Sequence, residues 1–215
     1  MSPPQAPKLT VQLSLSPTTY SFSNPTPPTL RLSITSDAER PITLLTFNTP
    51  FHPATGMTQD CFPIWDLTTD SAVKTTSVRI NRLPLSRARG SGDEEYFLTL
   101  PPSETTTVST RFARGNEDLR PLSRAEAERE REEAERSGTA RRSLFACGVD
   151  GLEPGHRYSV SVAKGKLMSF WWVWGTKDDL LVDPESREWG LDNIQAEEAP
   201  LEIKEIAGVE FDIEH

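Results

Sequence analysis

The chain is poor in the residues from which most catalytic sites are built. Its 215 residues include only three histidines and two cysteines, with no Gly-rich phosphate loop and no Gly-x-Ser-x-Gly nucleophile turn. None of the histidines has another His or Cys at metal-ligand spacing. We therefore interpret His52 and His156 as surface turn residues, and His215 is the last residue. The sequence predicts no catalytic residue, no cofactor and no metal site.

Two cysteines are too few for a disulfide framework. We expect Cys61 and Cys147 to be free buried thiols, with one bridge between them as the alternative. The first residues lack the basic and apolar segments of a secretory signal. No window approaches the ~18 apolar residues of a membrane span. These features predict a cytoplasmic or nuclear location.

Positive charge is scarce, with 23 Lys and Arg against 32 Asp and Glu, which gives a net charge of −9. This balance argues against a nucleic-acid partner, which would require a basic face. It also argues against binding to an anionic membrane surface. Apolar residues make up 35% of the chain, below the usual value of about 45–50%. The low apolar content predicts that part of the chain lies outside the core. The charge balance leaves another protein as the expected partner.

Many short strands separated by turns are predicted. The 18 prolines outnumber the 12 glycines, which favours strand ends and turns over helices. Apolar and polar residues alternate in residues 9–15 and 30–34, which is the period of a half-buried strand. Further strand-like segments lie at residues 42–47, 61–67, 74–80, 96–100, 105–112, 157–163 and 170–174. No alternation of strands with helices is present, so an antiparallel β-sandwich is favoured.

Two segments depart from this pattern. Residues 113–143 are a charged insertion, in which Ser123-Arg124-Ala125-Glu126 is a capping-box sequence that opens a helix without an apolar stripe. We expect this insertion to be partly helical and solvated, with a charged docking arm as the alternative. Residues 184–215 form an acidic tail, in which Ala207-Gly208 could turn the chain into an edge hairpin. The tail is expected to pack on the chain's own sheets, or to pair with a partner.

Residues 170–174, Phe-Trp-Trp-Val-Trp, are the sharpest local feature. In a strand, successive side chains point to opposite faces, so both faces here are apolar. Such a strand is either covered on both sides or exposes an aromatic platform for a sugar, peptide or protein. The covered strand is favoured. The residues predicted for a contact surface are Trp171, Trp172, Trp174, Phe51 and His52.

Asp178, Asp179 and Asp183 follow the aromatic run. Clustered oxygens suit Ca²⁺, but the spacing is not that of an EF-hand, so solvated loop carboxylates are favoured. Acids beside a Trp floor also keep a second class of function open, a small carbohydrate-active or other hydrolytic enzyme.

The run of residues 41–47 ends in the corner Asn48-Thr49-Pro50, followed by Phe51. With its neighbours, this run resembles the non-catalytic immunoglobulin-like β-sandwich that precedes the catalytic domain in some deuterolysin-type (M35) zinc peptidases. The resemblance covers residues 9–112, with a weaker continuation at residues 155–162. The other matching segments are Tyr20-x-Phe22, Leu30-x-Leu32-x-Ile34, Cys61-Phe62-x-Ile64, Asn81-Arg82, Asp93 to Tyr96 and Leu100 to Glu104.

This resemblance implies a fold rather than an activity. The chain carries no zinc motif, so no peptidase residue is carried over. The expected fold is an all-β, antiparallel immunoglobulin-like β-sandwich over residues 1–183, followed by the acidic tail. The expected function is a non-catalytic module that binds another protein. The alternatives are the hydrolytic enzyme and a regulator of a peptidase-like partner in trans.

Overall fold

The protein is built mainly of β-strands. The structure is a computed structural model that describes residues 6–23, 26–75, 84–113, 121–138, 149–167, 171–197, 200–204 and 206–214. The strands are β1 (Lys8–Ser16), β2 (Thr19–Ser21), β3 (Thr29–Ser36), β4 (Ile42–Leu45), β5 (Ile64–Asp66), β6 (Ser71–Ala72), β7 (Phe97–Leu100), β8 (Thr105–Arg111), β9 (Arg157–Val160), β10 (Trp172–Trp174), β11 (Glu202–Ile203) and β12 (Val209–Glu214). The helices are α1 (Pro53–Gly56), α2 (Arg124–Ser137) and α3 (Lys177–Leu180), with the 3₁₀ turns η1 (Glu94–Tyr96), η2 (Lys164–Leu167) and η3 (Leu191–Asn193).

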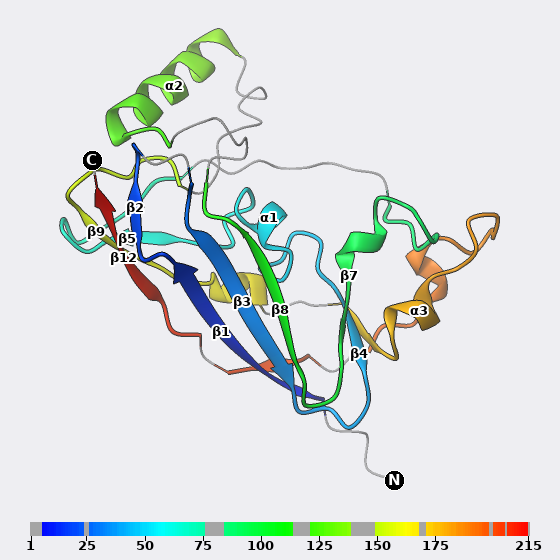
Figure 1. The fold of residues 1–215 in the computed structure, drawn as a ribbon. Helices are drawn as coiled ribbons and strands as arrows, with labels where there is room; N and C mark the ends of the chain where they lie inside the picture. Colours follow the sequence, from blue (N-terminus) through cyan, green and yellow to red (C-terminus); the bar gives the residue numbers. More distant parts are fainter. Residues whose placement is uncertain are drawn as a thin grey trace.

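Within the described ranges, the strands form three sheets. Sheet A has the order β11-β1-β3-β8, sheet B has the order β2-β12-β9-β5-β6, and sheet C has the order β10-β4-β7. Most neighbours are antiparallel, as predicted. Two edge pairings differ, because β11 runs parallel to β1 and β2 runs parallel to β12. In Figure 1, sheet A lies in front, β4 and β7 lie to one side of it, and α2 stands apart above the sheets.

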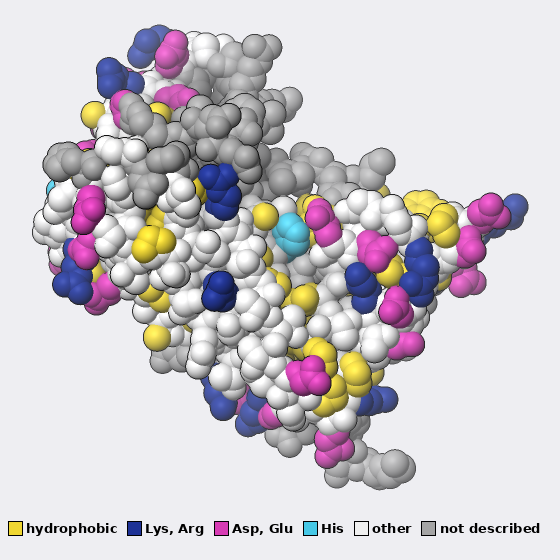
Figure 2. All heavy atoms as spheres, in the orientation of Figure 1, with side chains coloured by type: hydrophobic (Ala, Val, Ile, Leu, Met, Phe, Trp, Pro, Cys, Tyr) yellow, Lys and Arg dark blue, Asp and Glu magenta, His cyan; other side chains and the backbone are white. Residues whose placement is uncertain are grey.

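The alternation in the first strands places one face of sheet A in the core. The inward leucines, isoleucine and valine of β1 and β3 are buried and face residues of β5, β9 and β12 in one cluster. The outward positions carry Ser, Thr, Gln and Arg, and Figure 2 shows little hydrophobic colour over this face. The predicted strands at residues 9–15, 30–34 and 105–112 are confirmed as β1, β3 and β8. Most of the segment predicted at residues 74–80 lies outside the described residues.

The corner after β4 is held by its own hydroxyls. Thr46 Oγ1 donates to the carbonyl of Tyr96 (3.0 Å), and Thr49 Oγ1 donates to the carbonyl of Thr46 (2.8 Å). Asn48 has a φ of 59°, in the left-handed region that Asn tolerates better than most residues. These bonds end β4 sharply, so that Phe51 turns into the core, where it is 1% exposed.

The C-terminal segment is part of the β-structure and does not form the predicted hairpin. β11 joins sheet A beside β1, whereas β12 joins sheet B between β2 and β9. Phe211 and Ile213 of β12 are buried in the main cluster. The two strands therefore enter different sheets, because each finds its partner far away in the sequence rather than across the turn at Gly208.

The described part of the charged insertion is helical, as expected. Helix α2 begins after Ser123, whose N–H donates to Glu126 Oε2 (2.9 Å), while Glu126 N–H donates to Ser123 Oγ (3.4 Å). This reciprocal pair is the predicted capping box. Glu132 and Arg136 form a helix-spaced ion pair at 3.9 Å. The rest of the predicted insertion, residues 114–120 and 139–143, lies outside the described residues.

Candidate functional site

The aromatic strand β10 is covered on both faces. Trp172 and Trp174 pack against the main core cluster, and Trp172 is 1% exposed. Trp171 and Val173 belong to a second cluster with residues of β7, α3 and the segment after it. In the described residues, β10 is therefore a strand with apolar contacts on both faces. Trp172 does not offer an exposed aromatic face, since its ring lies inside the core.

The other two predicted contact residues, Phe51 and His52, lie in the corner after β4. Phe51 lies in the core. His52 is the N-cap of α1, with Nδ1 2.9 Å from Thr55 Oγ1, and its ring packs edge-on against Tyr96 at 4.8 Å between centroids. Burial lowers the pKa of His52 below its ordinary value, although Glu95 opposes this shift. Phe51 therefore contributes to the core that also contains Trp172, and His52 caps α1.

Trp174, one of the five predicted residues, lines a groove. Its half-buried ring lies under the guanidinium of Arg40, 4.2 Å from the ring centroid, which is a cation–π geometry. The groove has a volume of about 620 Å³ and is formed by the start of β1, the turn between β3 and β4, and the end of β10. Lys8, Asp37 and Glu39 also line it, so it carries both signs of charge around one aromatic ring.

The backbone of β10 lacks a hydrogen-bond partner at the same place in the described part of the chain. Gly175 N–H donates to the carbonyl of Pro41 (2.9 Å), and Leu45 N–H donates to the carbonyl of Trp171 (3.0 Å). Since hydrogen-bonded pairs alternate in an antiparallel ladder, the N–H and C=O of Trp174 point away from β4. No described residue bonds to them, whereas the carbonyl of Trp172 already accepts from Glu197 N–H (3.0 Å). Among the residues that the structure describes, the edge of β10 is therefore unpaired at Trp174.

The three acids that follow the aromatic run, Asp178, Asp179 and Asp183, form an ion pair or accept hydrogen bonds from nearby residues. Asp178 forms an ion pair with Arg89 at 2.8 Å. Asp179 Oδ2 accepts from the N–H (2.7 Å) and hydroxyl (2.8 Å) of Thr176, which lowers the pKa of Asp179. Asp183 accepts from the N–H of Glu185 (2.9 Å). Within the described ranges, no three His, Cys, Asp or Glu side chains are grouped as a metal site.

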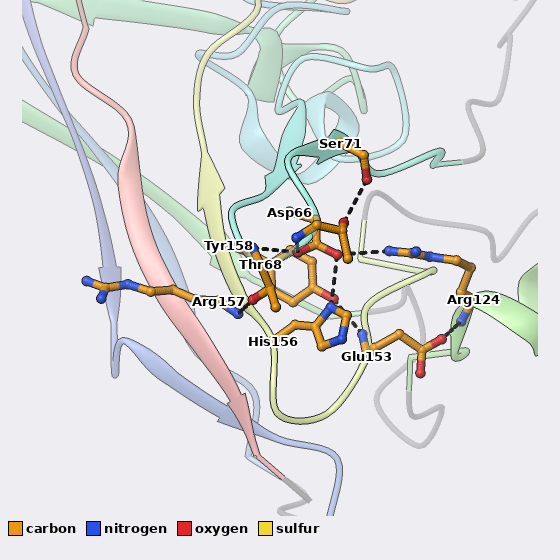
Figure 3. Close-up of polar contacts among 9 residues, drawn as sticks. Asp66, Thr68, Ser71, Arg124, Glu153, His156, Arg157 and Tyr158 are labelled. Atoms are coloured by element: carbon orange, nitrogen blue, oxygen red, sulfur yellow. Dashed lines mark hydrogen bonds and ion pairs between the residues drawn. The ribbon is translucent and has the colours of Figure 1, made fainter.

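Sequence reasoning missed a buried polar cluster centred on Asp66 (Figure 3). The side chain of Asp66, at the end of β5, is 0% exposed. Its Oδ2 accepts from Arg124 Nη2 of α2 and lies 2.9 Å from Nδ1 of His156, which precedes β9. Its Oδ1 accepts from the backbone N–H groups of the residues two and three positions later, at 2.9 and 3.1 Å.

These bonds decide the charge state of Asp66. Burial alone would raise its pKa, but hydrogen bonds from His156, Thr69 and Arg124 outweigh this effect and lower the pKa to about 2. An Asp–His pair can orient an imidazole for proton transfer. Here the same carboxylate also holds an arginine and two backbone N–H groups, which is the arrangement of a structural anchor.

The interpretation of His156 as a surface turn residue was wrong in part. Its side chain is 26% exposed, bonds to Asp66 and stacks on Tyr158. The Tyr158 hydroxyl accepts from the N–H of Glu153 (2.7 Å), and burial raises the pKa of Tyr158 to about 12. The strand period offered one signal for this cluster, because Asp66 shares the inward face of β5 with Ile64.

Burial also raises the pKa of the Cys61 thiol to about 11, and Cys61 is a free buried cysteine, as expected. Cys147 lies outside the described residues. None of the helices in the described part of the chain has the length and apolar character needed to cross a bilayer.

No protein-family model matches the chain, and no curated protein matches it by sequence.

Proposed function

We propose that the chain is a non-catalytic binding module with an immunoglobulin-like β-sandwich fold, and that it binds an extended segment of another protein at the edge of β10. The fold proposal rests on the alternating strands of sheets A and B around one core, and on the resemblance to the deuterolysin-type sandwich. The binding proposal rests on a separate observation at Trp174.

That observation is an unpaired strand edge beside an aromatic groove. The N–H and C=O of Trp174 have no partner among the described residues, and the same residue supplies the ring that lines the groove. An extended peptide that adds to a strand edge gains main-chain hydrogen bonds, while neighbouring pockets select its side chains. The Trp174 edge offers both kinds of contact within one residue.

The groove chemistry favours a protein segment as the occupant. Trp and Arg are enriched among residues that dominate protein interfaces, and here Arg40 lies directly over Trp174. Asp37 and Glu39 next to Arg40 match a segment that carries both signs of charge. A nucleic acid would meet a chain with a net charge of −9. A cytoplasmic or nuclear location, where thiols stay reduced, belongs to this proposal and fits the free thiol of Cys61.

Affinity capture with matched variants tests the proposal. Trp174→Ala removes the ring in the groove, and Arg40→Ala removes the group above it without changing β10. Trp189→Ala is the control, because Trp189 is 47% exposed and does not line the groove. We expect one protein to be captured by the wild type and by Trp189→Ala, to cross-link next to β10, and to be lost with both groove variants. Equal capture by folded groove variants would contradict the proposal.

A further inference from the structure

A second pocket lies between the first turns of α2 and strand β6. It has a volume of about 240 Å³, and its walls come from Ser71 and Lys74 on one side, α2 on the other, and Gly151. Gly151 has a φ of 88°, and a Cβ there would meet Val73 Cγ1 at 3.3 Å, so glycine allows the chain to run close to this wall. The pocket is separate from the Trp174 groove.

The pocket is basic although the chain is acidic. Lys74, Arg124 and Arg131 line it, with Glu128 as the single acid among its lining residues. Arg131 is half-buried, and no described residue forms an ion pair with it or with Lys74. Arg124 is paired with Asp66, so Lys74 and Arg131 against Glu128 leave an excess of positive charge in the pocket, which favours an anion as its occupant.

Arg124 is fixed in place. Its Nη2 donates to the buried Asp66 carboxylate at 2.9 Å, which leaves the other guanidinium N–H groups for a ligand. Arg124 and Arg131 are seven residues apart, so they lie on the same face of α2, above β6. The helix N-terminus itself is not the binding element, because the N–H groups of Ser123, Arg124 and Glu126 already donate to side chains.

We propose that this pocket binds a phosphate group, either as a small phosphate or phosphate monoester or as a phosphorylated side chain. Arginine guanidinium groups match phosphate oxygens with paired N–H donors, and lysine adds a point charge. The volume suits one phosphate with a small carrier. The bound anion would join α2 to β6, which matters because α2 has no apolar stripe of its own with which to pack on the sheet.

Titration of the full chain with inorganic phosphate, followed by ¹H–¹⁵N NMR, tests this site. We expect saturable shifts at the amides of Gly151 and Ala72, both pocket residues. Arg131→Gln should weaken binding about tenfold or more, the usual loss for a charge-assisted hydrogen bond. Arg131→Lys should restore part of the affinity.

Arg129→Gln is the matched control, because it removes the same charge from α2 at an exposed position that does not line the pocket. It should leave the affinity unchanged. A phosphoserine peptide and its unphosphorylated counterpart distinguish the two sources of phosphate: tighter binding of the phosphopeptide than of inorganic phosphate indicates a phosphoprotein ligand, and equal or weaker binding indicates a small phosphate. Absence of saturable shifts, or equal weakening by Arg129→Gln and Arg131→Gln, would overturn the proposal.

Discussion

Asp66 is a buried carboxylate on which three separate parts of the chain meet. It ends β5, receives a hydrogen bond from Arg124 of α2, and lies 2.9 Å from His156 next to β9. The alternation in β5 predicts that Asp66 points inward. It does not predict that Arg124 and His156 are its partners. His156 lies 90 residues away, and local sequence gives no sign that the two side chains meet. His156, which the sequence predicts to be a surface turn residue, therefore belongs to the buried network around Asp66.

Asp66→Asn should lower the free energy of unfolding by about 2–3 kcal/mol at pH 7, because the variant leaves the guanidinium of Arg124 without its buried carboxylate. Urea unfolding measures the change. Asp70→Asn is the control in the same turn, since Asp70 is exposed and accepts a hydrogen bond from Trp65 Nε1. An equal loss in the two variants would contradict the role given to Asp66.

The contribution of Asp66 should depend on pH with a definite sign. The folded state lowers the pKa of Asp66 from its ordinary value of 3.8 to about 2. The ionised carboxylate therefore adds stability that is fully present above pH ~4 and is lost as the pH falls toward 2. The difference between wild type and Asp66→Asn should shrink over this range. A difference that stays constant between pH 5 and pH 3 would show that charge is not the cause.

The length of a strand decides how well the sequence predicts it. The alternation in β1 and β3 predicts those strands and their buried faces, since eight paired positions carry a clear period. The parallel pairings of β2 and β11 escape prediction because strands of three and two residues carry almost no period. The separation of β11 and β12 into different sheets likewise depends on partners far away in the chain.

Phe211→Ala tests whether β12 is part of the core. Its ring is 1% exposed and packs on Phe112 and Tyr158 at 5.3 and 5.5 Å between centroids. We expect a loss of about 3–5 kcal/mol in the free energy of unfolding. Val209→Ala, at a partly exposed position of the same strand, should cost only about 1 kcal/mol. Thermal or urea unfolding gives both values, and a small loss for Phe211→Ala would mean that the segment lies loosely on the sheets.

At the scale of the whole molecule, the two proposed sites use different surfaces. The Trp174 groove lies between the start of β1, the turn between β3 and β4, and the end of β10, whereas the basic pocket lies between α2 and β6. The overall charge of −9 predicts a protein rather than a nucleic acid as partner, but it hides the local cluster of Lys74, Arg124 and Arg131. Composition gives the average charge, and only the packing of α2 brings these cations together.

The position of Trp174 in the groove likewise depends on tertiary packing. The run of tryptophans indicates a doubly apolar strand, and the structure has one. Which ring reaches a groove depends on where β10 ends relative to the turn that carries Arg40, and this is a tertiary relationship. Periodicity alone cannot separate Trp174 from Trp172, because both side chains lie on the same face of the strand.

Amide hydrogen exchange at β10, with and without a captured partner protein, tests the central claim most directly. Val173 lies in a hydrogen-bonded pair with Thr43, so its amide should exchange slowly in both states. The Trp174 amide has no partner among the described residues, so it should exchange fast in the free protein and slowly in the complex, when the partner's strand accepts its hydrogen bond. A partner that binds while the Trp174 amide still exchanges fast would contradict strand addition at this edge.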